Sequence, residues 1–136
     1  MKPTELVRLA KTAMQRAYVP YSGYKVGAAL LTKGGKVYLG CNIENAAFGP
    51  SNCAERTAFF TAIAAGETEF ESIAVVGGKD GVVTDIFPPC GVCRQVMQEF
   101  CGPDFEIHMQ KAGGGVFTVK LPELLPFGFT KDSMEA

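Results

Sequence analysis

The chain has 136 residues, among them five cysteines and one histidine, and its 13 basic and 14 acidic side chains give a formal net charge of -1. This length predicts a single domain over residues 1–136, and the near-neutral charge disfavours polynucleotides and anionic membranes as partners. The first residues show no apolar leader and no apolar run is long enough to cross a bilayer, so we expect a cytoplasmic protein.

The predicted secondary structure begins with an amphipathic helix that Thr4 can cap and that ends at Pro20. Its apolar stripe consists of Leu6, Val7, Ala10, Ala13, Met14 and Ala17. Two apolar runs separated by Lys33-Gly34-Gly35 then predict a hairpin. The elements expected after the first helix are strands over 25–32 and 36–41, a loop over 42–52, a helix over 53–65, a strand over 72–77, a loop over 78–89, a helix over 90–100, strands over 105–110 and 116–120, and a helical turn over 122–125.

A hairpin followed by alternating strands and helices is typical of an α/β fold with a central sheet. Because the helix expected over 90–100 connects two strands as a crossover, one pair of strands should be parallel. We therefore predict a three-layer α/β/α sandwich with a mixed five-stranded sheet, in which the second and third helices lie side by side.

Three cysteines lie at the starts of the second and third predicted helices, in the segments Cys53-Ala54-Glu55 and Pro89-Cys90-Gly91-Val92-Cys93. An odd cysteine count in a reducing compartment argues against a disulfide framework. Cys90 and Cys93 are three residues apart and share one helix face, and helix N-termini favour the thiolate that binds metal. Since the single histidine, His108, is remote, three sulfur ligands would leave the fourth position of a tetrahedral zinc ion for water, as in a catalytic site.

Glu55 supplies the carboxylate that can move a proton between such a water and a substrate. Its spacing from Cys53 raises a geometric difficulty, because residues two apart on a helix point to different sides. Each segment taken alone also has other interpretations. Cys90 and Cys93 fit a redox pair or half of a structural zinc knuckle, Glu55 fits a capping box with Asn52, and Cys53 fits a small core residue.

Four segments extend the pattern over nearly the whole chain: Val26-Gly27-Ala28-Ala29-Leu30-Leu31, Gly40-Cys41-Asn42-Ile43-Glu44-Asn45-Ala46, Cys53-Ala54-Glu55-Arg56-Thr57-Ala58 and Pro89-Cys90-Gly91-Val92-Cys93-Arg94-Gln95. Together they resemble the small homotetrameric zinc-dependent cytidine deaminases. The resemblance implies that Cys53, Cys90 and Cys93 hold one zinc ion per subunit with its bound water or hydroxide, and that Glu55 is the catalytic proton shuttle. The implied reaction is hydrolytic deamination of cytidine and 2′-deoxycytidine to uridine and 2′-deoxyuridine, with release of ammonia, in pyrimidine salvage.

The resemblance also implies the residues that bind the nucleoside. The backbone N–H of Ala54 would hold O2 of the base, and Asn42 and Glu44 would bind the 3′-hydroxyl of the ribose. Arg56 would donate hydrogen bonds to the ligand sulfurs and so reduce the negative charge of a three-thiolate site. Without the resemblance, these residues would be interpreted as ordinary polar residues of a helix, a strand end and a loop.

The resemblance also implies two aromatic residues at the site, one of which comes from a neighbouring subunit. Tyr24 would lie against the nucleoside, and Phe129 would reach into the pocket of a neighbouring subunit of a homotetramer; both also fit simple aromatic packing. The sequence departs from the family pattern at Phe48, where tyrosine is commoner, at Phe87-Pro88, where serine is frequent, and in a longer loop over 78–88. These departures bear on the subunit contacts and the pocket rim.

Three other functions compete with this interpretation. A deaminase of another amino-heterocycle would share the metal site, but Asn42 and Glu44 fit a ribose. A polynucleotide editor is disfavoured by the net charge. A non-enzymatic zinc module or a redox protein would not need Glu55.

Overall fold

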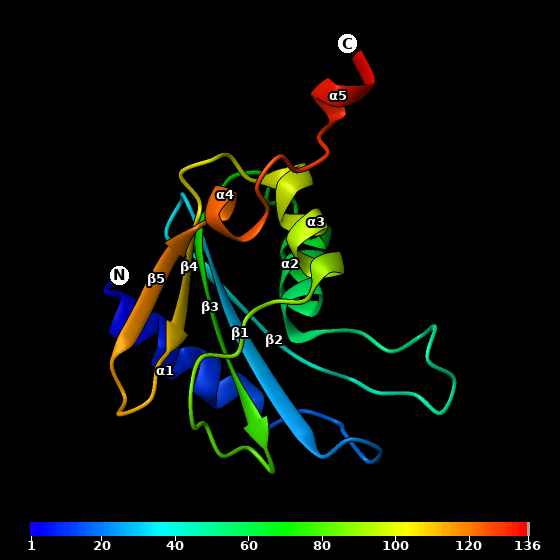
Figure 1. The fold of residues 1–136 in the computed structure, drawn as a ribbon, viewed down its shortest axis with the longest axis vertical. Coiled ribbons are helices and arrows are strands. Elements are labelled where there is room, and N and C mark those ends of the chain that lie inside the picture. The colour runs from blue at the N-terminus through cyan, green and yellow to red at the C-terminus, as the bar shows by residue number, and fades with distance from the viewer. Residues whose placement is uncertain (136) are drawn as a thin grey trace.

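The computed structural model describes residues 1–135, which form a central sheet with helices on both faces (Figure 1). The elements in chain order are α1 (Pro3–Met14), β1 (Tyr24–Thr32), β2 (Val37–Cys41), α2 (Ala54–Ala64), β3 (Phe70–Lys79), α3 (Gly91–Phe100), β4 (Glu106–Gln110), β5 (Val116–Lys120), α4 (Leu121–Leu124) and α5 (Lys131–Glu135). The predicted helices and strands are present, and α5 is an additional short helix.

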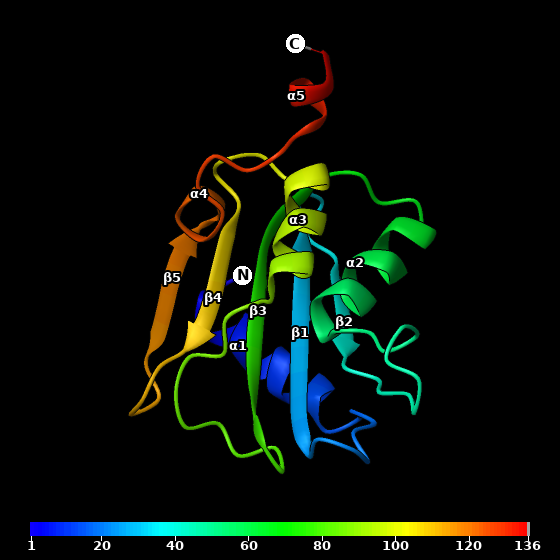
Figure 2. The ribbon, with the colours of Figure 1, turned by 45° about the vertical axis from the view of Figure 1, so that its right-hand side comes forward.

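The five strands form one mixed sheet in the order β2-β1-β3-β4-β5. β3 and β4 are parallel, and the other neighbouring strands are antiparallel. The chain passes from β3 to β4 through α3, so the predicted crossover and the mixed five-stranded sheet are confirmed (Figure 2). β3 is longer than the predicted strand over 72–77, because it pairs with β1 from Phe70 to Lys79.

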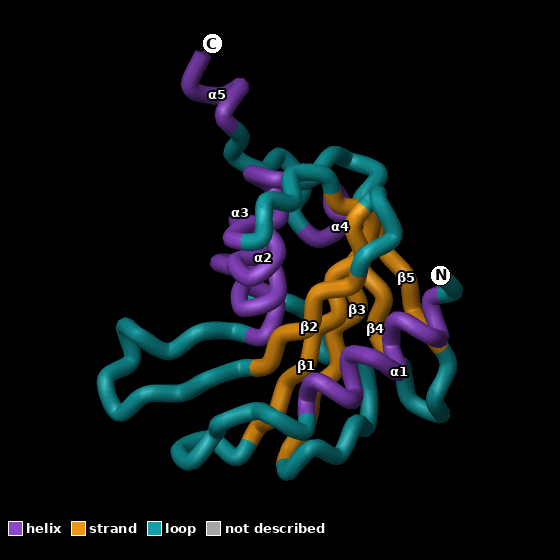
Figure 3. Tube along the Cα trace, turned by 180° about the vertical axis from the view of Figure 1, so that it is seen from behind, coloured by secondary structure: helices purple, strands orange, loops and turns teal. Residues whose placement is uncertain are grey.

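The two faces of the sheet carry separate apolar clusters. On one face, Leu6 and Met14 of α1 pack with Ala74 of β3, and Figure 3 shows α1 crossing this face. On the opposite face, Phe59 of α2 and Met97 of α3 belong to the larger cluster. This arrangement confirms the three-layer α/β/α sandwich and places α2 and α3 side by side over the same face (Figures 1 and 2).

Two strand glycines allow the helices to approach the sheet closely. A Cβ atom at Gly27 of β1 would clash with the backbone of α1, including the amide nitrogen of Met14 at 2.5 Å. A Cβ atom at Gly40 of β2 would clash with the carbonyl oxygen of Ala54 and lie 2.5 Å from the amide nitrogen of Ala58, both in α2. Gly40 therefore fixes the distance between β2 and the first turn of α2.

The first helix is shorter than predicted, since α1 ends at Met14 and Ala17 lies beyond it. The backbone of Tyr18 instead pairs with the segment after β2: its N–H donates to the carbonyl of Asn42 at 3.0 Å, and its carbonyl accepts from the N–H of Glu44 at 2.9 Å. A residue that pairs with a strand in this way cannot continue a helix. The apolar periodicity that predicted the longer helix reflects only local sequence, so it does not reveal this long-range pairing.

The N-terminal cap of α1 also differs from the prediction. Lys2 is the N-cap residue, without a side-chain cap hydrogen bond, and Pro3 occupies the first turn, so Thr4 does not cap the helix. Proline is favoured in the first turn because that position needs no intrahelical N–H donor. Across residues 1–135, none of the helices combines the length and apolarity that crossing a membrane requires.

His108 lies buried in β4, with 3% of its surface exposed. Its Nδ1 atom forms a hydrogen bond with Oγ1 of Thr118 on β5 at 2.7 Å. Burial lowers the pKa of the imidazole below its ordinary value of 6.5, and the negative charge of Glu106 opposes this shift.

The unfolded chain should therefore bind a proton at His108 near pH 6.5, whereas the folded protein binds it at lower pH. This difference stabilises the fold above pH 6.5, and the stabilisation is lost as the pH falls through 6.5 toward the folded-state pKa. We expect the free energy of unfolding in urea to fall more steeply between about pH 7.5 and about pH 5.5 in the wild type than in His108→Gln. Equal pH dependence of the two proteins would contradict this assignment.

Candidate metal centre and active site

Cys53 and Cys90 are the N-cap residues of α2 and α3, and both have extended backbone just before the helix begins. This placement removes the geometric difficulty of the sequence, because Cys53 precedes the helix that contains Glu55, and the two need not share a helix face. It also removes the alternative of a capping box with Asn52, since α2 has no side-chain cap hydrogen bond.

The sulfur atoms of Cys53, Cys90 and Cys93 lie within 4.8 Å of one another. The Sγ atoms of Cys53 and Cys90 are 3.7 Å apart, and those of Cys90 and Cys93 are 3.6 Å apart. A tetrahedral zinc ion with Zn–S bonds of about 2.3 Å separates its sulfur ligands by about 3.8 Å, so the spacing fits one zinc ion. The predicted convergence of the three sulfurs is therefore present, and three ligands leave one position open.

A shared proton links two sulfurs of the cluster, and Cys53 is the one with thiolate character. A hydrogen bond with the Cys93 side chain is the main cause that lowers the pKa of Cys53 to about 5; burial opposes it, and Arg56 lowers the pKa further. The pKa of Cys93 is raised, first by the same hydrogen bond and then by burial, so the proton stays on Cys93. A soft divalent cation can take the place of that shared proton.

Arg56 is the third residue of α2 and reaches back to the N-cap residue. Its Nη2 atom donates to the Sγ of Cys53 at 3.2 Å, which is the contact with a ligand sulfur that the family resemblance implies. Its Nε atom is buried without a hydrogen-bond partner among the residues that the structure describes. The guanidinium therefore brings positive charge to the sulfur cluster, which offsets the negative charge of the thiolates.

Glu55 is the second residue of α2, and only 4% of its surface is exposed. Burial is the main cause that raises its pKa to about 7; a hydrogen bond from its own backbone N–H opposes the shift, and the negative charge of Cys53 adds to it. A carboxyl group with a pKa near neutrality can both accept and donate a proton. Cys93 also hydrogen-bonds with this carboxyl group, so Glu55 lies beside the sulfur cluster.

Glu55, Cys53 and Cys90 border a cavity of about 360 Å³, whereas Cys93 is buried and does not line it. Among the predicted residues, it is lined by Asn42, Glu44, Cys53, Ala54, Glu55, Arg56 and Cys90. The other residues that line it have no binding role predicted from the sequence: Val26, Ile43, Phe48, Ser51, Asn52, Phe87 and Pro88. No chemical signal marks these residues in the sequence, since Val26 looks like any buried strand residue and Phe87 stands out only as a departure from the family pattern.

The side chains of Asn42 and Glu44 form hydrogen bonds with backbone groups of the segment 21–26, next to the cavity. The Asn42 side chain accepts from the N–H of Val26 at 2.9 Å and donates to the carbonyl of Tyr24 at 2.8 Å. The Glu44 carboxylate accepts from the N–H groups of Tyr21 and Ser22 and from the hydroxyl of Ser22, and these bonds lower its pKa. A carboxylate can accept further hydrogen bonds, and the amide keeps one N–H, so both can also contact a ligand.

Tyr24 and Phe129 do not line this cavity. Tyr24 is 47% exposed, and the Nζ atom of Lys79 lies 5.3 Å from the centroid of its ring. Phe129 is 59% exposed, and its carbonyl accepts a hydrogen bond from Gln95 of α3 at 2.9 Å. The structure of one chain therefore does not bring either ring to the sulfur cluster.

Arg94 ties the C-terminal segment to the loop that carries Cys90. Its Nε atom donates to the carbonyl of Pro89 at 2.8 Å, and its Nη1 atom donates to the carbonyl of Leu124 at 2.7 Å. Together with the bond from Gln95 to Phe129, these contacts attach the end of α4 and the segment that follows it to α3.

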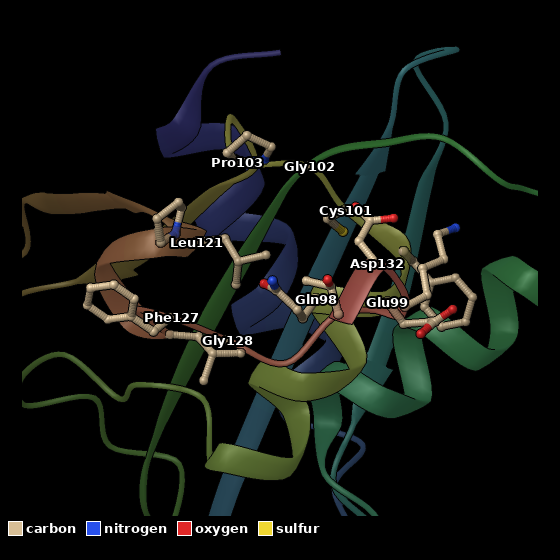
Figure 4. Close-up of a pocket in the computed structure, with 14 residues that line it drawn as sticks. Gln98, Glu99, Cys101, Gly102, Pro103, Leu121, Phe127, Gly128 and Asp132 are labelled. Carbon is tan, nitrogen blue, oxygen red and sulfur yellow. The ribbon is translucent and has the colours of Figure 1, made fainter. Parts of the chain in front are cut away.

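A larger cavity of about 480 Å³ lies between the C-terminal end of α3, α4 and the segment that follows α4 (Figure 4). It contains one cysteine, Cys101, and its charged residues Glu99, Lys131 and Asp132 are exposed. Within residues 1–135, the only cluster of His, Cys, Asp and Glu side chains that could hold a metal is the three-cysteine cluster. The chemistry is therefore concentrated in the smaller cavity.

Comparison with known proteins agrees with this geometry. The family model described as "Cytidine and deoxycytidylate deaminase zinc-binding region" matches residues 1–109. Cytidine deaminase of Sporosarcina psychrophila is 43% identical over 134 residues, which are 98% of this chain and 96% of that protein. Cytidine deaminase of Halalkalibacterium halodurans is 46% identical over 129 residues, 95% of each chain. The crystal structure of cytidine deaminase from Burkholderia pseudomallei has a TM-score of 0.86 and 48% identity, and the match covers 95% of this chain and 100% of that one.

Proposed function

The chain belongs to the cytidine and deoxycytidylate deaminase family, and from this premise we propose that it hydrolytically deaminates cytidine and 2′-deoxycytidine to uridine and 2′-deoxyuridine, with release of ammonia. One observation carries the proposal: three sulfurs converge beside a buried carboxyl group, and this group borders the same cavity as Cys53 and Cys90. The substrate is a free nucleoside, the chain acts as one catalytic domain, and the reaction belongs to pyrimidine salvage in the cytoplasm.

Cys53, Cys90 and Cys93 would hold the zinc ion that this family binds, and the sulfur spacing fits it. When bound, zinc supplies a Lewis acid and makes water a competent nucleophile near neutral pH. Arg56 would limit the negative charge that three thiolates bring to the metal, through its hydrogen bond to Cys53.

Glu55 would move the protons of the reaction. It would take a proton from the attacking water and deliver it to N3 of the base, and carry a second proton to the amino group as the C4–N bond breaks and ammonia leaves. Its burial beside the sulfurs supports this role. Ala54 is the first residue of α2, where a backbone N–H has no acceptor within the helix, so it would donate to O2 of the base.

Asn42 and Glu44 would bind the 3′-hydroxyl of the ribose through the hydrogen-bonding capacity that their backbone contacts leave. We propose a homotetramer in which Tyr24 lies against the nucleoside and Phe129 of a neighbouring subunit completes the site. The exposure of Phe48, at 92%, and of Phe129, at 59%, supports a subunit contact near these residues. Light scattering should then give four times the 14.5 kDa mass of one chain.

An ultraviolet assay of cytidine loss, with zinc quantified in the same preparation, tests the proposal. We expect one zinc per chain and conversion of cytidine to uridine, with little conversion of free cytosine because it lacks the ribose. Equal turnover of cytosine would contradict the ribose-binding role of Asn42 and Glu44. A zinc-loaded protein that leaves cytidine unchanged would contradict the proposed function itself.

A further inference from the structure

Phe87 forms an apolar wall of the cavity. The residue belongs to the loop between β3 and α3, yet its side chain is partly buried and packs against the apolar cluster beneath α2 and α3. It lines the cavity together with Val26 of β1. The aromatic ring therefore contacts the sheet below and borders the space that a ligand would fill.

Gly77 of β3 makes room for this ring. A Cβ atom at Gly77 would lie 2.9 Å from the Cγ and Cδ1 atoms of Phe87 and 3.1 Å from Cγ2 of Val26. Gly77 and Val26 are paired across β3 and β1, so they occupy the same level of the sheet. The ring of Phe87 thus rests on bare backbone, and any side chain at position 77 would push it away from the sheet, toward the cavity.

The walls of the cavity differ in polarity. The first turn of α2 offers the carboxyl group of Glu55 and the N–H of Ala54 on one side. Val26 of β1 and Phe87 of the loop before α3 lie on other elements and offer apolar surface without hydrogen-bonding side chains. A cytosine ring matches this division, because N3 and O2 form one polar edge, whereas C5 and C6, on the opposite edge, carry only hydrogen.

We propose that Phe87 is a specificity-determining residue that faces the C5 edge of the pyrimidine and limits the size of a substituent there, and that Gly77 is its positioning residue. This inference rests on the proposed function, because that function directs the N3 and O2 edge of the base toward Glu55 and Ala54. The substrate class is then cytidine with hydrogen or a small group at C5.

The test compares kcat/KM for cytidine and for 5-methylcytidine. Phe87→Ala should raise the ratio of 5-methylcytidine to cytidine about tenfold, the usual effect of one carbon in an apolar pocket. Gly77→Ala should lower the ratio, because the added Cβ atom moves the ring of Phe87 into the cavity. The double variant Gly77→Ala/Phe87→Ala has no ring to move, so its ratio should equal that of Phe87→Ala. Ile86→Ala is the matched control, since Ile86 is the exposed neighbour that does not line the cavity, and its ratio should stay unchanged.

An unchanged ratio in Phe87→Ala, with zinc bound and cytidine still deaminated, would overturn the proposal. If Phe87→Ala does not fold, Phe87→Leu replaces it, because it keeps the apolar contact with the sheet and removes the far half of the ring. Wild-type protein that binds zinc but deaminates neither nucleoside would instead refute the proposed function, so the two failures are distinguishable.

Discussion

Replacing Glu55 by glutamine is expected to lower kcat for cytidine by about two to four orders of magnitude, the usual contribution of a general acid–base group. The substitution keeps the shape and hydrogen-bonding capacity of the side chain but prevents it from accepting or releasing a proton. Zinc content, measured on the same sample, should stay at the wild-type value, because the three sulfurs are untouched.

The stability of Glu55→Gln separates catalysis from folding. Burial raises the pKa of Glu55 to about 7, so the carboxylate is disfavoured in the folded protein, and neutral glutamine should not lower the free energy of unfolding. Glu71→Gln is the control, since Glu71 lies exposed on β3 and should keep full activity. Wild-type turnover in Glu55→Gln, or loss of zinc in proportion to activity, would contradict the proton-transfer role.

Gly40→Ala is expected to cost about 3 kcal/mol in the free energy of unfolding, at the upper end for an overpacked site. The added Cβ atom would meet the carbonyl oxygen of Ala54 and lie 2.5 Å from the amide nitrogen of Ala58. Because both are backbone atoms of α2, a rotamer change cannot relieve the contact, and the first turn of the helix must move. That turn follows Cys53 and contains Glu55, so zinc content and turnover should fall as well.

Urea unfolding and zinc analysis of Gly40→Ala check this expectation. Gly34→Ala in the turn of the same hairpin is the matched control, because its added Cβ atom would be 3.8 Å from Oγ1 of Thr32, an ordinary contact. We expect the control to unfold within about 0.5 kcal/mol of the wild type. Equal stability and zinc content of the two variants would show that β2 does not set the position of α2.

The sequence was sufficient to predict the sheet, the layers and the sulfur cluster, because these depend on short-range patterns. Alternation of strands and helices predicts the mixed sheet, and a cysteine at the start of two helices predicts the convergence of Cys53, Cys90 and Cys93. Helical spacing alone indicated that the side chains of Cys53 and Glu55 point to different sides of one helix. The structure places Cys53 at the N-cap, and a helix boundary is not determined to one residue by composition.

Features that depend on long-range contacts were predicted less well. The end of α1 follows from the pairing of Tyr18 with the chain beyond β2, which periodicity does not reveal. Phe87 lines the cavity because Gly77, ten residues earlier, leaves room for it on the sheet. The roles of Tyr24 and Phe129 stay predictions, since they require atoms of a bound nucleoside or of another subunit.

The separation of the ligands along the chain has a consequence for how the protein tolerates chelators. Cys53 and Cys90 are 37 positions apart in sequence, and the intervening stretch contains all of α2 and β3. A metal ion bound by both cysteines acts as a reversible cross-link of that stretch. Because the cross-link lowers the entropy of the unfolded chain, it should stabilise the fold by about 4 kcal/mol. Removal of the ion by a chelator should therefore destabilise the layer formed by α2 and α3 and make it more susceptible to proteases. The melting temperature should then depend on whether the metal is bound.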